Sequence, residues 1–250
     1  MIEGREQGWP AWTWLSFALA IALFAAFALY ERRVKRRGAY PLVDFSLFSE
    51  RAFSMGLLAQ LIFYMTMAGF YLFFAVYVQN GRGLDALQAG TLFVANGVGY
   101  LVSSSIARLT GARLGRQILT LAGLLRAIGL GMLALIAFGL SEAQSVAWLI
   151  PGLFINGLGT GFAVARLAAN VLARVSTQHA GAASGVLTTV LQVGNAFGVA
   201  VTGIIFYGTL DRAGYAHAFG LSLAYLIALC LLLCLLVQFL PSNRSTEERA

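Results

Sequence analysis

The chain has 250 residues, of which 59% are apolar and 11% are charged, whereas about 25% of the residues in soluble domains are charged. This composition and a mean hydropathy of +0.79 exclude a soluble globular domain, a disordered chain and a disulfide-stapled secreted module. The net charge of +7 would suggest nucleic acid binding in a soluble protein, but here the basic residues lie in short segments between apolar runs, so no nucleic-acid partner is predicted.

Seven apolar runs are long enough to cross a bilayer as helices, which takes about 20 residues each. In chain order the runs cover 12–30, 53–78, 86–107, 118–140, 146–172, 180–209 and 217–240. Strands of a membrane barrel would alternate apolar and polar residues, and no such alternation is visible. The sequence therefore predicts an all-α, polytopic membrane helix bundle.

The runs divide the chain into tails, loops and membrane segments. The predicted parts are an extracytoplasmic tail (1–11), a linker transmembrane helix (12–30), a basic cytoplasmic loop (31–52), a six-helix unit (53–240) and a cytoplasmic tail (241–250). The first run is not a signal peptide, because the charge in front of it is not positive.

Charge asymmetry between the loops predicts the orientation. Loops 31–52, 108–117, 172–179 and 241–250 together hold twelve of the 17 Lys and Arg residues. The other side of the membrane has three: Arg5, Arg82 and Arg212. Because cytoplasmic loops carry the excess of basic residues, we expect a multi-pass protein of the plasma (inner) membrane with its N-terminus outside and its C-terminus cytoplasmic.

The membrane segments contain no acidic residue, since all ten Asp and Glu lie outside the apolar runs. Proton-coupled transporters usually carry an intramembrane carboxylate, so this chain alone lacks the obvious means of proton coupling. Lys35 is the only lysine and lies in a loop, which excludes a retinal protein with its intramembrane Schiff base. No nucleotide loop, catalytic triad or metal cluster is present, and neither an enzymatic activity nor a cofactor or metal is predicted.

Two arginines, Arg126 and Arg166, lie inside apolar runs. Arg126 is near mid-depth, where a charge by default marks a functional site that faces the protein interior. Gly123 and Gly129 share its face and indicate close contact with another helix. The alternative is a structural arginine that snorkels or bonds backbone carbonyls. Arg166 lies near the cytoplasmic end of its run, where snorkelling explains it.

Uncharged polar residues at depth could line a polar cavity. They are Gln60, Tyr64, Asn96, Asn156, Gln192 and Asn195. Each could equally make a helix–helix hydrogen bond worth about 0.6 kcal/mol, and packing is the favoured interpretation for any single one.

Small residues at a spacing of four predict closely packed helices. The residues expected at such seams are Gly99, Ser103, Gly157, Gly161, Gly181, Gly185, Gly194 and Gly198. Cys230 and Cys234 share a helix face, and packing is their expected role because two thiols alone make a poor metal site.

Several segments in order resemble the C-terminal half of a major facilitator superfamily transporter, and more narrowly the fourteen-helix drug:proton antiporter branch of the EmrB/QacA type. They are Ile2-Glu3-Gly4, Glu31-Arg32-Arg33, Pro41-Leu42-Val43-Asp44, Tyr77-Val78-Gln79, Gln88-Ala89-Gly90, Gly157-Leu158-Gly159-Thr160-Gly161, Gly181-Ala182-Ala183-Ser184-Gly185 and Gln192-Val193-Gly194. The resemblance covers about residues 2–205. According to this resemblance, the first residues of the chain correspond to an external loop of the family.

The loop Ala112-Arg113-Leu114-Gly115-Arg116 resembles the superfamily's basic gating loop. Arg113, Gly115 and Arg116 are therefore the gating-loop candidates. Ala112 stands where the family has an acid, and Arg108 stands where the family pattern opens with Gly.

The resemblance implies a fold of two six-helix halves with a substrate site between them near the bilayer midplane. This chain would supply a linker helix and the C-terminal half, built as two three-helix repeats. The runs at 53–78, 86–107, 146–172 and 180–209 would line the cavity, which makes the six polar residues candidate wall residues. Aromatic residues of the second run would complete a lipophilic wall: Phe63, Tyr64, Phe70, Phe73 and Phe74.

The leading hypothesis is the C-terminal half of a multidrug-type efflux transporter that exports lipophilic small molecules by alternating access. Proton coupling would then require an N-terminal half. The alternative is a truncated or non-transporting membrane subunit or interaction module, which could be a homodimer. The expected partners are the lipid bilayer, a small lipophilic substrate, and either an N-terminal half or a second copy of the chain.

Overall fold

The computed structural model describes residues 11–36, 51–114, 117–139, 145–172 and 180–238, and nearly all of them are helical. The elements in order are α2 (Ala11–Arg36), α3 (Arg51–Val76), the π-helical turn η2 (Tyr77–Gly81), α4 (Ala86–Leu114), α5 (Gln117–Gly139), the 3-10 turn η3 (Val146–Trp148), α6 (Leu149–Leu172) and α7 (Ala180–Gln238). No strand occurs among these residues. The predicted all-α membrane bundle is confirmed, because six of the helices are long and apolar enough to cross a membrane.

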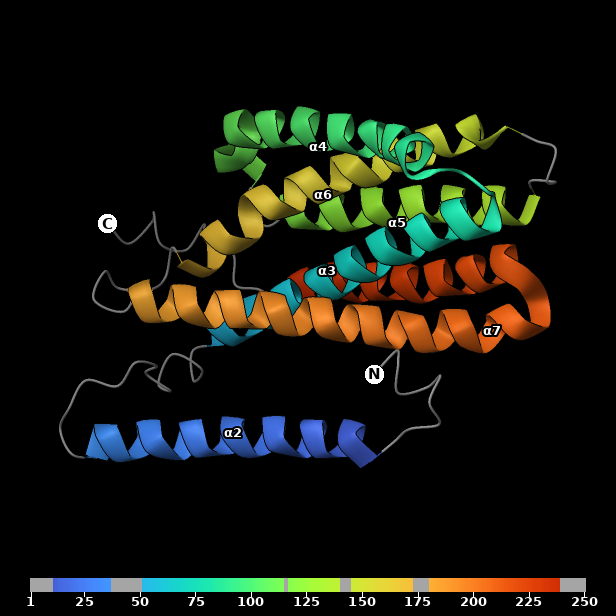
Figure 1. Ribbon diagram of the computed structural model, residues 1–250. Coiled ribbons are helices and arrows are strands. Elements are labelled where there is room, and N and C mark those ends of the chain that lie inside the picture. The colour runs from blue at the N-terminus through green and yellow to red at the C-terminus, as the bar shows by residue number, and fades with distance from the viewer. Residues whose placement is uncertain (1–10, 37–50, 115–116, 140–144, 173–179, 239–250) are drawn as a thin grey trace.

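Helix α7 contains two of the predicted membrane crossings. It is 59 residues long and bends at Gly214, whose φ of 76° and ψ of 176° are not helical. A positive φ is readily adopted only by glycine. Figure 1 shows that the chain doubles back at this bend, so that the two legs of α7 run side by side. We refer to residues 180–213 as the first leg and to residues 215–238 as the second leg.

Helix α2 lies apart from the other helices in Figure 1. Its described side chains are exposed except near its C-terminal end, where Glu31 is buried. Trp12, Leu15 and Leu19 are among the exposed apolar residues. Such a surface suits contact with lipid.

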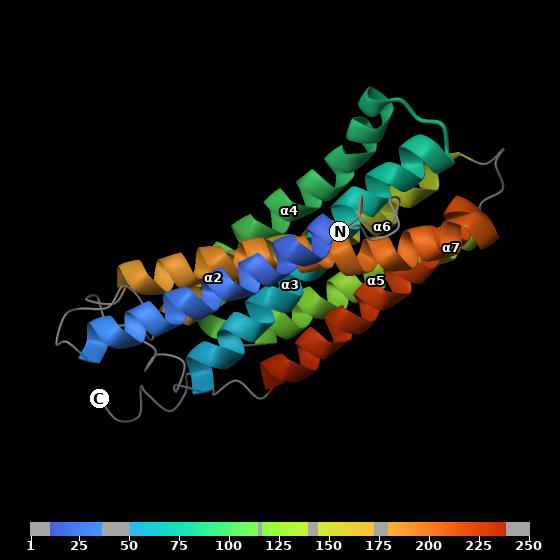
Figure 2. The same ribbon diagram turned by 60° about the horizontal axis from the view of Figure 1, so that its bottom comes forward.

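The remaining helices form one bundle, in which they run roughly side by side (Figures 1 and 2). Helix α3 packs mainly against α7, α4 packs against α6, and α5 packs against both α6 and α7. Without a hydrophobic force between helices in lipid, such contacts depend on close van der Waals packing.

Glycines allow the closest of these approaches. On α6, Gly157 faces the backbone of Asn96, and Gly161 faces Ser103. Gly198 on α7 faces the backbone of Met65, and Gly194 and Gly99 make equivalent contacts in the α3–α7 and α4–α6 seams. Gly181 and Gly185 differ, because a Cβ at either would meet no atom within 4 Å. These two therefore lie outside the helix seams of the described bundle.

Aromatic side chains of α3 and of the following turn η2 belong to the core of the bundle. Phe73 packs on the Phe206 ring with centroids 5.0 Å apart, and Tyr77 stacks on Phe219 at 4.5 Å and 7°. Such pairs add about 0.5–1.5 kcal/mol each. Phe63, Phe70, Phe73 and Phe74 are all at most 1% exposed. The expectation that they line the substrate cavity is wrong, since a surface left open for a second half would expose them; of that set only Tyr64 is partly exposed.

Candidate functional site

Two of the predicted polar residues, Asn96 and Asn156, belong to a hydrogen-bonded chain across three helices. Asn156 of α6 donates from Nδ2 to Oδ1 of Asn96 on α4 at 2.9 Å. Asn96 in turn donates from Nδ2 to the Tyr71 hydroxyl of α3 at 3.3 Å. Both asparagines are buried. This geometry favours the packing interpretation for the pair, and their role in a cavity stays a prediction.

Sequence reasoning missed Tyr71 as a member of this chain. Tyr71 follows Tyr64 by seven residues, a spacing that places both on one face of a helix. That spacing was the one signal in the sequence that could have pointed to Tyr71 as a second polar residue beside Tyr64. Because α3 is apolar on every side, however, the sequence could not show which face meets α4.

Three of the predicted residues, Tyr64 on α3 and Gln192 and Asn195 on the first leg of α7, reach the surface of the bundle. A Cβ at Gly194 would contact the Cβ of Tyr64, so this turn of α7 packs against α3 beside Tyr64, whereas Gln192 lies two residues before Gly194 and therefore on another face of α7. Tyr64 and Asn195 are partly exposed, and Gln192 is exposed. The Oδ1 atom of Asn195 is buried and has no hydrogen-bond partner among the described residues. We call these three polar residues, each of which reaches the bundle surface, the open polar seam.

The sixth candidate, Gln60, is buried on α3 with 3% of its surface exposed. Its Oε1 has no hydrogen-bond partner in the described part of the chain. An amide oxygen of this kind is costly to bury without a partner. Gln60 is therefore inside the six-helix unit rather than on the open polar seam.

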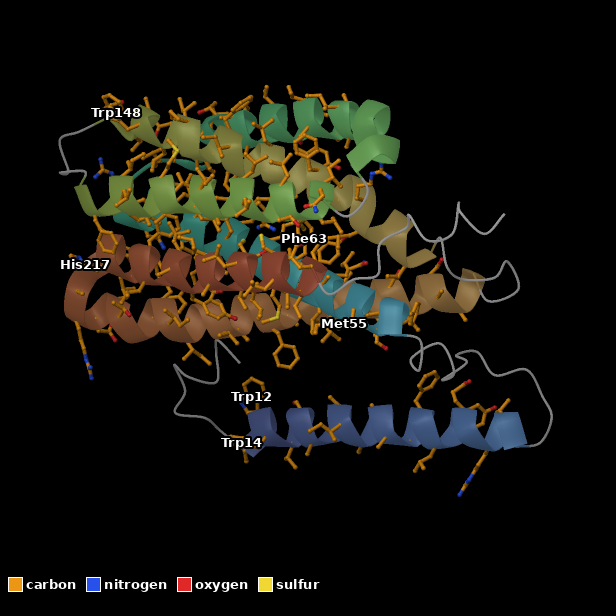
Figure 3. All side chains as sticks on the ribbon, turned by 180° about the vertical axis from the view of Figure 1, so that it is seen from behind. Trp12, Trp14, Met55, Phe63, Trp148 and His217 are labelled. Carbon is orange, nitrogen blue, oxygen red and sulfur yellow. The ribbon has the colours of Figure 1, made fainter. Side chains whose placement is uncertain are left out.

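Arg126 points into the bundle. It is 1% exposed, and its Nη1 donates to the backbone oxygen of Phe63 on α3 at 3.5 Å. Its guanidinium carbon lies 4.8 Å from the centroid of the Phe63 ring, a cation–π contact. Figure 3 shows Phe63 inside the bundle, among the packed helices. Arg126 thus bonds a backbone carbonyl and connects α5 to α3.

The face of α5 that carries Arg126 is packed closely against two helices. Gly159 of α6 faces the Cγ of Arg126, and Gly129 faces the backbone of Asn156. Gly123 faces the thiol of Cys234 on the second leg of α7. The close helix contacts predicted for Gly123 and Gly129 are confirmed.

Other candidates are less well defined by the structure. Arg166 is partly exposed near the end of α6. Arg113 belongs to the last turn of α4, but its side chain is outside the described residues, as are Gly115 and Arg116. The described residues contain no group of His, Cys, Asp and Glu that could hold a metal ion.

The bundle and its membrane-length helices define a helical membrane protein with several crossings. The family model of the Major Facilitator Superfamily matches residues 6–199 and 57–249. The chain therefore belongs to the Major Facilitator Superfamily, which is a family of transporters and not of enzymes.

Curated relatives carry names from drug and antibiotic export or resistance. The chain is 37% identical over 220 residues to the "Probable actinorhodin transporter" of Streptomyces coelicolor, covering 86% of this chain and 38% of the relative. It is 26% identical to the multidrug resistance protein Stp of Mycobacterium tuberculosis, over 87% of this chain and 39% of the relative. A puromycin resistance protein of Streptomyces alboniger is 28% identical over 96% of this chain and 50% of its own length.

The chain spans half or less of the length of these relatives, between 38% and 50%. The resemblance to drug exporters that the sequence indicated is confirmed at the level of the family. What the relatives are named for is a property of those longer proteins.

Proposed function

We propose that this chain forms the C-terminal half of an efflux transporter that exports lipophilic small molecules by alternating access. The names of the relatives and the share of their length that the chain covers support this proposal. The observation that carries it is the open polar seam, where uncharged polar side chains reach the bundle surface at predicted membrane depth. In transporters built from two halves, the substrate site lies between the halves at that depth.

The chemistry of the open polar seam suits an uncharged or weakly polar substrate. Tyr64 offers a ring face and a hydroxyl, while Gln192 and Asn195 offer amide donors and acceptors. None of these groups is charged, so binding a lipophilic molecule requires no desolvation of an ion.

Proton coupling is assigned in this proposal to the other half. All ten acidic residues lie outside the apolar runs, so a carboxylate that takes up and releases a proton within the membrane must come from an N-terminal half. The N-terminus of this chain would lie outside and its C-terminus in the cytoplasm of a plasma-membrane protein.

The test is complementation between halves. Cells that lack their own major drug pumps would express this chain, the N-terminal half of the Streptomyces coelicolor relative, or both, and accumulation of a lipophilic fluorescent dye would be measured. We expect accumulation to fall only when both halves are present. Asn195→Leu should weaken this effect, whereas Ser105→Leu, on the exposed surface of α4, is the control and should not.

The other outcomes distinguish the alternatives. If the two halves copurify from membranes and the dye still accumulates, the chain is not a transporting half and the non-transporting subunit is correct. If the chain alone lowers accumulation, a homodimer of this chain transports, and the requirement for an N-terminal half is wrong.

A further inference from the structure

Tyr71 lies on a side of the bundle that is only partly covered. It shares a face of α3 with Tyr64 and Met67, and all three side chains are partly exposed. Helix α4 does not seal this face, because its close packing is against α6 rather than α3. In contrast to the buried phenylalanines of α3, these three side chains have surface that another molecule can touch.

Two contacts from α4 hold the Tyr71 side chain. Its hydroxyl accepts a hydrogen bond from Nδ2 of Asn96 at 3.3 Å. Its ring meets the Phe93 ring edge to face, with centroids 5.8 Å apart and an interplanar angle of 79°. Because edge-to-face contact is a favoured geometry for aromatic pairs, the phenol is held in one orientation before any substrate arrives.

The hydrogen bonds behind Tyr71 all run in the same direction. Asn156 donates to Asn96 at 2.9 Å, and Asn96 donates to Tyr71, so the phenol oxygen at the end of the chain is an acceptor. A phenol also has one O–H to donate. Among the described residues, the Tyr71 hydroxyl donates to no group. Hydrogen bonds in a chain polarise one another, which makes this terminal O–H a stronger donor.

The direction of the chain leaves one group unpaired at its buried end. Oδ1 of Asn156 is buried and has no hydrogen-bond partner in the described part of the chain. Reversing both amides would pair this oxygen, but Tyr71 would then donate to Asn96 and have no O–H left. An unsatisfied buried group in a native structure calls for an explanation. The observed direction supplies one, because it keeps a donor available at the partly exposed end.

We infer that Tyr71 donates its O–H hydrogen bond to a carbonyl oxygen of the exported molecule, and that Asn96 and Asn156 are positioning residues for this bond. The inference rests on the proposed function and gives its substrate class as an aromatic carbonyl compound. The rings of Tyr64 and Tyr71 and the thioether of Met67 provide apolar contact for flat rings. The O–H provides the selection for an acceptor.

The test is the infrared carbonyl band of fluorenone bound to the purified full chain in detergent. The band is identified because it moves when the carbonyl carbon is isotopically labelled. Donation by Tyr71 should lower its frequency relative to fluorenone in empty micelles. Tyr71→Phe should reverse this shift, and Asn96→Ala should reduce it. Tyr207→Phe, a partly exposed tyrosine on the first leg of α7, is the control and should leave the band unchanged.

Affinity separates the hydrogen bond from ring packing. Equilibrium dialysis against detergent blanks should show saturable binding of fluorenone that Tyr71→Phe weakens about 2–10-fold, the effect of losing one hydrogen bond. Fluorene has the same rings without the carbonyl, so its affinity should not change in this variant. Equal losses for both compounds would overturn the inference, because the loss would then come from packing.

Three other results would also refute the inference: no saturable binding of fluorenone, a wild-type band at the frequency found in empty micelles, or a lowered band that Tyr71→Phe leaves in place. The second applies even if the variant does not fold. Dye export by the two halves tests the proposed function separately. Export together with an unshifted band refutes the inference alone, whereas a Tyr71-dependent shift without export refutes the proposed function and leaves the hydrogen bond established.

Discussion

Arg126 contacts both the ring and the backbone of Phe63. The guanidinium carbon lies 4.8 Å from the ring centroid, and Nη1 lies 3.5 Å from the carbonyl oxygen of the same residue. The contact joins α5 to α3 at the level where Gly159 of α6 also meets Arg126. One side chain thus connects three helices inside the bundle.

Removing the Phe63 ring should destabilise the chain through Arg126. Phe63→Leu keeps an apolar side chain but loses the cation–π contact, so we expect a loss of about 1–2 kcal/mol in unfolding free energy. Thermal unfolding in detergent measures it. Phe197→Leu is the control, because Phe197 is 50% exposed, and it should change Tm little. Equal Tm shifts in the two variants would show that the contact contributes nothing.

Adding a methyl group at Gly157 should destabilise the contact between α4 and α6, whereas the same addition at Gly185 should have little effect. Gly157→Ala places a Cβ against the backbone of Asn96, which should cost about 1–3 kcal/mol because the backbone cannot move aside easily. Gly185→Ala adds the same group where nothing lies within 4 Å. The Tm and the monodispersity of the two purified variants provide the comparison. A stable Gly157→Ala would contradict the close α4–α6 seam.

The hydrogen bond between Asn96 and Asn156 should be measurable as a coupling energy. In a double-mutant cycle with Asn96→Ala and Asn156→Ala, we expect about 0.6–1.7 kcal/mol from unfolding free energies in detergent. The same variants test the cavity prediction in the assembled transporter. Additive effects on stability, together with a loss of dye export, would favour a role in the cavity over a role in packing.

The bend of α7 should depend on glycine at one position. Gly214 has a φ of 76°, and a side chain there is strained. Gly214→Ala should therefore lower stability by about 1–2 kcal/mol. Gly208→Ala, in a regular part of the first leg with open space around it, should be neutral or slightly stabilising. If both variants have the same Tm, the bend does not require glycine.

The predicted orientation can be tested with cysteine labelling in intact cells. Cys230 and Cys234 are buried, so they give a low background. Arg212→Cys introduces an exposed thiol at the α7 bend, which we expect to react with a membrane-impermeant maleimide added outside. Arg33→Cys, exposed at the C-terminal end of α2 in the predicted cytoplasmic loop, should react only after the cells are lysed. The reverse pattern would invert the topology.

The sequence by itself determined the fold class and the positions of the membrane segments. Runs of about 20 apolar residues cross a bilayer because a helix satisfies its own backbone hydrogen bonds in lipid. This reasoning needs only the composition of each segment. It separated the runs 180–209 and 217–240, and the structure describes residues 180–238 as the two legs of the single helix α7, bent at Gly214. The composition of the same apolar runs also showed that they contain no Asp or Glu.

Only the tertiary structure decided which side of each helix meets which neighbour. The aromatic residues of α3 were expected at the cavity, yet Phe73 and Phe74 are in the core, while Tyr64 reaches the surface. In a soluble protein, the contrast between apolar and polar faces would have shown this, but lipid and protein core are both apolar. Asn96 meets Asn156, and Arg126 meets Phe63, because of how each helix is rotated and how closely it packs on its neighbours. The composition of a segment does not encode this rotation.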